Sequence, residues 1–76
     1  MSMETQNLVR MANRIGQFFE ATPQHAVAVE GVANHIRKFW EPRMRRDLLA
    51  WVDANGATDL HPLVAEVVAD QRERIA

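Results

Sequence analysis

Apolar side chains recur at helical spacing in four segments of the chain, and no segment shows the sustained alternation of apolar and polar residues that is typical of a strand. This spacing predicts four helices, over about 6–20, 24–40, 42–54 and 60–70. The connections are short, so we expect neighbouring helices to lie antiparallel or at an angle, as in a small bundle. The sequence therefore predicts an all-α fold as a single helical domain over 1–76, with 1–5 and 71–76 frayed.

The residues that share one face in each predicted helix form the expected core. They are Leu8, Met11, Ala12, Ile15, Phe18 and Phe19; Val29, Val32, Ala33, Ile36, Phe39 and Trp40; Met44, Leu48, Trp51 and Val52; and Leu60, Leu63, Val64, Val67 and Val68. Because both tryptophans follow this spacing, core packing is favoured over stacking on a cofactor.

Prolines, a glycine and two polar residues predict where the helices begin and end. Thr22 is expected to cap the second helix, and Pro42 to end that helix near Trp40 and begin the third. Gly56 is expected to stop the third helix in a left-handed conformation, and Asp59 to cap the fourth.

Two glycines, Gly16 and Gly31, lie inside the helical pattern. A glycine in a helix interior costs about 1 kcal/mol relative to alanine. Close approach of two helices is the favoured reason for accepting this cost, and contact with a partner's backbone is the alternative.

The composition narrows the class of protein. The chain has 76 residues, 47% of them hydrophobic, no cysteine and a net charge of −1. The absence of cysteine excludes disulfides and is consistent with a reducing cytoplasm. We see neither a secretory signal nor an apolar run long enough to span a bilayer, and we expect no membrane partner. The slight acidity argues against a general nucleic-acid binder, and the high apolar content suggests a surface that contacts a partner.

The sequence offers no constellation typical of catalysis or of metal binding. His25, His35 and His61 follow no metal-ligand spacing. There is neither a glycine-rich phosphate loop nor a nucleophile motif. We therefore expect the histidines to lie at the surface or at the edge of the core, and we expect this chain to hold no metal, no cofactor and no catalytic site.

Positive charge gathers in one window, "RKFWEPRMRR" (37–46), which holds five of the nine basic residues. Arg37 and Lys38 fall in the last turn of the predicted second helix. Cations are favourable at that end of the helix dipole, so these two need no functional explanation.

Arg43, Arg45 and Arg46 fall instead in the first turn of the predicted third helix, where the dipole disfavours cations. Free helix N–H groups and three guanidinium groups meeting at this point would suit an anion, either carboxylates or a phosphate. A solvated face with surface ion pairs explains the same residues equally well. Both interpretations stay open.

Three stretches resemble a known family: "LVRMANRIGQFF" (8–19), "ANHIRKFWEPRMRRDLLAW" (33–51) and "LHPLV" (60–64). They are similar to the delta subunit of cytoplasmic NAD-dependent, molybdenum-containing formate dehydrogenases. The resemblance runs from Leu8 to about Val68, and its middle block is the most specific part.

The resemblance implies a non-catalytic accessory subunit in the cytoplasm that acts in assembly, cofactor maturation or stability of the catalytic subunit. Its partners would be the catalytic (alpha) subunit and other subunits of the complex. In that family those other subunits hold the bis-molybdopterin guanine dinucleotide, the iron–sulfur clusters and FMN.

Three hypotheses follow for the surface that binds a partner. The first places Arg43, Arg45 and Arg46 against acidic groups of the catalytic subunit, with Trp40 or Phe39 as an apolar anchor. The second assigns the same arginines to the pyrophosphate of the guanine-dinucleotide cofactor. The weakest alternative is a nucleic-acid-binding or regulatory module that uses the basic start of the third helix. Self-association of the isolated chain is left open.

Overall fold

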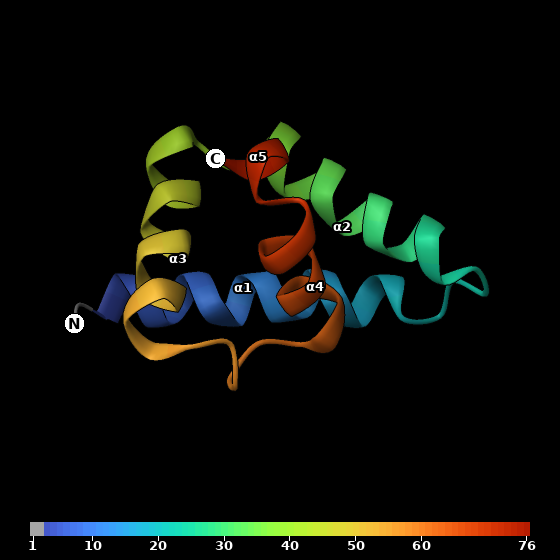
Figure 1. The fold of residues 1–76 in the computed structure, drawn as a ribbon, viewed down its shortest axis with the longest axis horizontal. Helices are drawn as coiled ribbons and strands as arrows, with labels where there is room; N and C mark the ends of the chain where they lie inside the picture. The colour runs from blue at the N-terminus through green and yellow to red at the C-terminus, as the bar shows by residue number, and fades with distance from the viewer. Residues whose placement is uncertain (1–2) are drawn as a thin grey trace.

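The chain folds entirely into helices over the part that the computed structural model describes, residues 3–76 (Figure 1). The helices are α1 (Met3–Phe19), α2 (His25–Phe39), α3 (Pro42–Asn55), α4 (Pro62–Asp70) and α5 (Arg72–Ile75). The all-α prediction is confirmed, and each of the four predicted helices corresponds to one of α1 to α4. Of the segment expected to fray at the N-terminus, residues 1–2 lie outside the described part, whereas α1 already includes 3–5.

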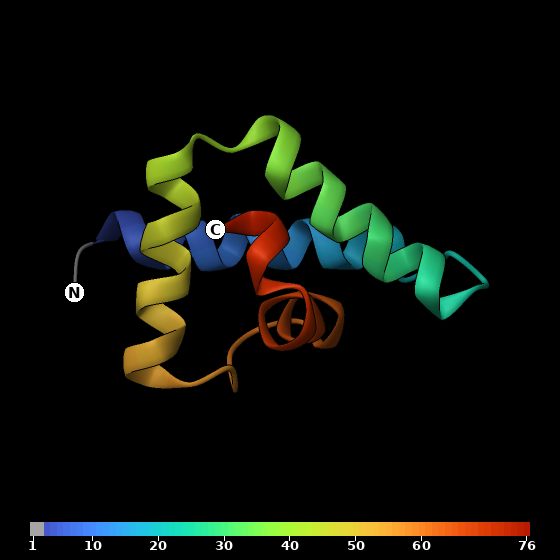
Figure 2. The same cartoon turned by 45° about the horizontal axis from the view of Figure 1, so that its top comes forward.

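The longest helix, α1, runs along the length of the molecule, and α2, α3 and α4 pack against it (Figure 1). α3 crosses α1 near its N-terminal half, whereas α2 runs back above α1 from the other end (Figure 2). α4 packs against both α1 and α2, and α5 packs against α2 and α4. One cluster of buried residues joins all five helices, and its largest fully enclosed members are Val32, Ile36, Leu48, Val64, Val67 and Ile75.

The inner face of α1 differs from the predicted one. Leu8 and Ala12 are buried as expected, but Met11 is 41% and Phe18 is 76% exposed. Val9 takes an inner position instead, and Gly16 is buried one turn after Ala12. Apolar residues surround more of α1 than one face needs, so their spacing alone left its rotation undetermined. The row of small residues identifies the side that packs closely.

The two adjacent aromatics at the end of α2 point to different environments. Phe39 is 71% exposed, so its placement in the core is wrong, whereas Trp40 is 6% exposed and belongs to the core. The helix ends between them, because Trp40 has an extended backbone with φ −91° and ψ 138°. This change of backbone direction lets the larger indole turn inward and leaves the phenyl ring outside. Trp51, at 8% exposed, confirms the prediction for the second tryptophan.

Two of the predicted helix ends are confirmed and two are wrong. Pro42 is in the first turn of α3, and Gly56 ends that helix with a φ of 83°. α2 begins at His25 after Gln24, so Thr22 does not cap it. His61 caps α4 in place of Asp59. Since Pro62 is the first helical residue, the capping position falls on the residue directly before it.

The C-terminal segment is ordered, although fraying was expected for 71–76. It forms α5, whose Ile75 is fully buried. Arg72 donates two hydrogen bonds to Asp53, at 3.0 and 2.7 Å, and Arg74 forms an ion pair with Glu30. The charges that suggested a solvated tail therefore fix it to α2 and α3.

Both interior glycines lie where side chains from other elements come close, which confirms intramolecular close packing as their role. A Cβ atom at Gly16 would lie 2.6 Å from Cγ of His61, and one at Gly31 would collide with the ring of Phe19. Real Cβ atoms essentially never approach so closely. The neighbours are rings, so glycine makes room for aromatic side chains at both positions.

Candidate docking surface

The three arginines at the start of α3 do not form one cluster. Arg45 is half-buried, and its Nη1 donates to the carbonyl oxygen of Arg37 at 2.9 Å. That carbonyl belongs to the last turn of α2, where unpaired carbonyls carry the negative end of the helix dipole. Arg45 therefore joins the end of α2 to the start of α3 through its Nη1, and the binding of an anion by the three guanidinium groups stays a prediction.

Arg37 also has an intramolecular role, beyond the dipole effect expected of it. Its Nη1 donates to the carbonyl oxygen of Arg74 at 3.1 Å, at the end of α5. Arg74 in turn donates to Asn34 at 2.7 Å and pairs with Glu30, both on α2. Two of the five basic residues in the window, Arg37 and Arg45, thus hold helix ends together.

Arg43 and Arg46 remain exposed. Within residues 3–76, no hydrogen bond or ion pair involves either side chain. Glu41 precedes α3 without capping it through its side chain, and the first turn holds no acidic residue. The conflict between these cations and the helix dipole is therefore uncompensated within that turn.

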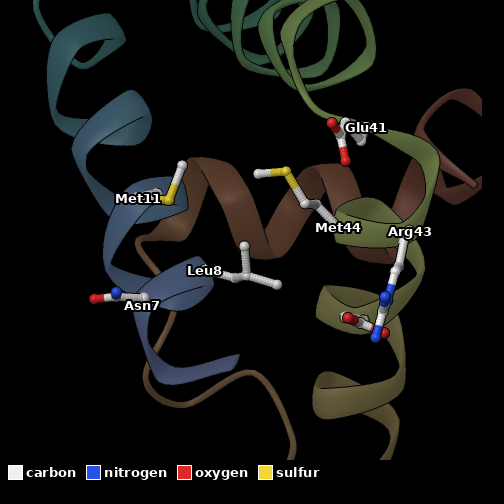
Figure 3. Close-up of a pocket in the computed structure, with 7 residues that line it drawn as sticks. Asn7, Leu8, Met11, Glu41, Arg43 and Met44 are labelled. Carbon is white, nitrogen blue, oxygen red and sulfur yellow. The ribbon is translucent and has the colours of Figure 1, made fainter. Parts of the chain in front are cut away.

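Beside Arg43 lies a hollow of about 320 Å³ between α1 and α3 (Figure 3). The side chains of Leu8, Met11 and Met44 point into it, while Asn7 points away (Figure 3). Charged residues complete its lining: Glu41, Arg43 and Asp47. Methionine side chains are flexible and polarisable, so a surface of this kind adapts readily to apolar side chains of a partner.

A second hollow of about 390 Å³ lies between α1 and α2 and is lined by Arg14, Ile15, Phe18, Phe19 and His35. The rings of Phe18 and Phe19 meet edge to face with centroids 5.0 Å apart. His35 contacts Phe39 with ring centroids 4.8 Å apart, which carries the aromatic surface toward the end of α2.

We call the largely apolar, exposed or partly exposed surface along the two hollows the seam surface, and it comprises Met11, Ile15, Phe18, His35, Phe39 and Met44. Of the five predicted partner-binding residues, Phe39 lies on this surface and Arg43 lines one of its hollows. Trp40 is buried and Arg45 is engaged, so neither is free to act as an anchor. The sequence interpretation missed Met11 and Phe18 because it assigned both to the core.

Two of the three histidines have hydrogen-bonding partners within the chain. His61 accepts a hydrogen bond at Nδ1 from the backbone N–H of Leu63, at 3.1 Å, and its Nε2 lies 2.8 Å from Glu20. His25 contacts Glu66 at 2.7 Å. Over the described residues, no three His, Cys, Asp or Glu side chains gather closely enough to hold a metal ion.

The groups with shifted pKa values lie away from the seam surface. A side-chain hydrogen bond from Arg74 lowers the pKa of Glu30, and one from Arg72 lowers the pKa of Asp53. The same bonds raise the pKa of both arginines. These pairs fix α5 and bear on stability.

Over residues 3–76, five helices surround one core and leave aromatic side chains exposed, which defines a small all-α protein that presents an apolar surface. The family model of the NADH-dependent formate dehydrogenase delta subunit FdsD matches residues 7–68, and the chain belongs to this family. The resemblance inferred from the sequence is thereby confirmed. The chain is a subunit of an NAD-dependent formate dehydrogenase complex, with other subunits as its partners.

Neither the curated proteins nor the solved structures include a significant match to the chain. Among the helices described, none combines the length and the apolar character needed to cross a membrane.

Proposed function

We propose that this delta subunit is a non-catalytic accessory chain that docks on the catalytic subunit of the complex in the cytoplasm and supports its assembly, cofactor maturation or stability. In this proposal the bis-molybdopterin guanine dinucleotide, the iron–sulfur clusters and FMN belong to the other subunits. One observation carries the proposal. Phe39 is 71% exposed at the end of α2, and the start of the next helix carries two exposed cations, Arg43 and Arg46, that have no partner within the described chain.

Docking would remove two unfavourable features at once. Burying an exposed phenylalanine contributes about 1.5–3 kcal/mol. An acidic group of the partner near Arg43 and Arg46 would offset their repulsion by the α3 dipole, which costs about 0.3–1 kcal/mol for each charge. Aromatic and arginine side chains commonly dominate the energetics of such interfaces.

The two alternatives have less support. Since Arg45 contacts the end of α2, two guanidinium groups remain for the pyrophosphate of the cofactor. Arg37 is likewise engaged, so the free positive charge available to a nucleic acid is smaller than the sequence suggested. The exposed phenylalanine fits neither phosphate hypothesis and favours a protein partner.

Co-purification tests the proposal. The complex is expressed with an affinity tag on the catalytic subunit, together with either the wild-type delta subunit or a triple variant, Phe39→Ser, Arg43→Ala and Arg46→Ala. The matched control carries Val27→Ser and Arg10→Ala, since Val27 is another exposed apolar residue and Arg10 another exposed cation. We expect the triple variant to reduce the recovered delta subunit at least tenfold and the control to leave it unchanged. Full recovery of a folded triple variant would contradict the proposal.

The molybdenum content of the tagged catalytic subunit separates the possible roles. If the delta subunit supports cofactor maturation, molybdenum per catalytic subunit falls when the triple variant replaces the wild type. If it supports stability alone, the metal content is kept and the thermal midpoint of the complex falls.

A further inference from the structure

We propose that the groove between α1 and α2 binds an amphipathic α-helix of a partner subunit, with bulky apolar residues on one face and acidic residues beside them. This inference rests on the proposed function and specifies the second half of the docking surface. The groove is the hollow of about 390 Å³ lined by Arg14, Ile15, Phe18, Phe19 and His35.

Two aromatic residues that line the groove make contacts within the chain. Phe19 is half-buried, and its ring lies against Gly31, where a side chain would collide with it. Phe18 meets that ring edge to face at a centroid distance of 5.0 Å yet remains 76% exposed. Phe19 thus packs against α2 and supports Phe18, so both rings line the groove in the unbound chain.

Three apolar residues of α1, two exposed and one partly buried, have the spacing of a helix-binding surface. Met11, Ile15 and Phe18 lie at i, i+4 and i+7, a rise of about 10 Å along the helix. Opposite them, α2 contributes His35 and Phe39, which are four residues apart and in contact. A cleft between two helices with this repeat accepts the apolar face of a third helix, as helix-in-groove interfaces do.

The charge around the groove selects an acidic partner. Arg14 lines the groove, whose lining within residues 3–76 contains no carboxylate, and Lys38 directly precedes Phe39. Both cations are exposed, and the described residues provide no hydrogen bond or ion pair for them. In the adjoining hollow, Arg43 is accompanied by Glu41 and Asp47, so that hollow adds no net positive charge. Glu20 at the end of α1 already contacts His61, and Glu30 on α2 already pairs with Arg74.

The same charges argue against a second copy of this chain as the occupant. In a twofold dimer each surface meets itself, so Arg14 and Lys38 of one copy would face the same cations of the other. A helix with Asp or Glu beside its apolar face would neutralise them. We therefore assign the groove to a different, acidic subunit.

Photo-crosslinking in the assembled complex tests the inference. The probe is p-benzoylphenylalanine in place of Phe18, with the same probe in place of Val27 as the control, since Val27 is 55% exposed but lies outside the groove lining. After irradiation of the purified complex, mass spectrometry identifies the crosslinked peptides. We expect the probe at Phe18 to capture a helical segment with net negative charge in another subunit, and the control to capture that segment at least tenfold less.

Charge reversal gives a second readout. The double variant Arg14→Glu and Lys38→Glu is expected to lower the affinity for the rest of the complex at least tenfold, whereas Arg10→Glu leaves it within twofold. A crosslink to a basic segment, to an extended segment or to a second delta subunit would overturn the inference. So would the absence of any crosslink from a delta subunit that still co-purifies, and in that case the proposed function would stand. Failure of the wild-type chain to co-purify would instead overturn the proposed function.

Discussion

The side of the molecule formed by α4 and α5 and the seam surface between α1 and α2 use the same kinds of residue in opposite ways. On the first side, Ile75 is fully buried and the arginines of α5 pair with Glu30 and Asp53. On the seam surface, Phe18 and Phe39 are more than two-thirds exposed, and the nearby cations make no ion pair within residues 3–76.

The contrast separates residues that stabilise this fold from residues that it leaves available. A buried isoleucine and paired arginines lower the free energy of the folded chain by themselves. Exposed aromatics beside unpaired cations add nothing to folding, and their favourable interactions require a second molecule. Substitutions on the first side should therefore change stability, and substitutions on the seam surface should change assembly.

The largest effect is expected where a short helix is held by one buried side chain. Ile75→Ala removes a fully enclosed side chain of α5 and should lower the free energy of unfolding by about 2–5 kcal/mol. Urea denaturation followed by circular dichroism measures this loss. Phe18→Ala is the comparison and should stay within about 0.5 kcal/mol of wild type. Equal losses for the two variants would remove the distinction between the two sides.

Replacing the two interior glycines by alanine should change stability by different amounts. In Gly16→Ala the new methyl group meets the ring of His61, which is held by Leu63 and Glu20, so we expect a loss of about 1–3 kcal/mol. In Gly31→Ala it meets Phe19 at the open groove, where the ring can move, and alanine gains about 1 kcal/mol of helix propensity. Thermal unfolding should rank Gly16→Ala as clearly the more harmful, and the reverse order would contradict the assignment of rigid and movable rings.

The next largest effect is a difference in stability loss between alanine variants of two neighbouring arginines of α3. Arg45→Ala removes the hydrogen bond to the carbonyl of Arg37 and should cost about 1–2 kcal/mol of stability. Arg46→Ala, at an exposed position without a described partner, should stay within about 0.5 kcal/mol. Denaturant midpoints of the two variants give the comparison directly. A loss at Arg46 as large as that at Arg45 would show that the start of α3 is a structural cluster.

The smallest effect is a dependence of stability on pH. Hydrogen bonds from Arg74 and Arg72 lower the pKa of Glu30 and Asp53 in the folded chain. Such carboxylates stabilise the fold at a pH above their pKa in the unfolded chain, which is about 4.3 for Glu and about 3.9 for Asp. They lose this contribution as the pH falls through their lower pKa in the folded chain. The thermal midpoint of wild type should therefore fall more steeply between about pH 5 and pH 2 than that of Glu30→Gln, Asp53→Asn. Parallel curves would mean that the two pairs contribute nothing.

Sequence periodicity was sufficient for the four longer helices, because each carries an apolar row and most of their ends are marked by proline or glycine. It was insufficient for the rotation of α1. Apolar residues cover a wider arc of that helix than its packed side needs, and the close approach of His61 to Gly16 shows which of them face inward. The small residues Ala12 and Gly16 were the available signal, and they mark the packed side.

The C-terminal helix could not be predicted from local pattern, because its stabilising partners are distant in sequence. Arg74 pairs with Glu30, and Arg72 with Asp53. The candidate docking surface was predicted only in part, because it too depends on contacts between residues that the fold brings together. The dipole argument singled out the arginines at the start of α3, and their role in binding stays a prediction. Only the folded chain brings the carbonyl of Arg37 to Arg45 and turns Trp40 inward.

The central claim is that the seam surface serves assembly and adds nothing to folding. The most direct test is a pair of readings on one variant, Phe18→Ser with Phe39→Ser: its thermal midpoint in isolation and its recovery with the tagged catalytic subunit. We predict an unchanged midpoint, because both rings are exposed, together with at least a tenfold loss of recovery. A folded variant recovered as fully as wild type would contradict the account.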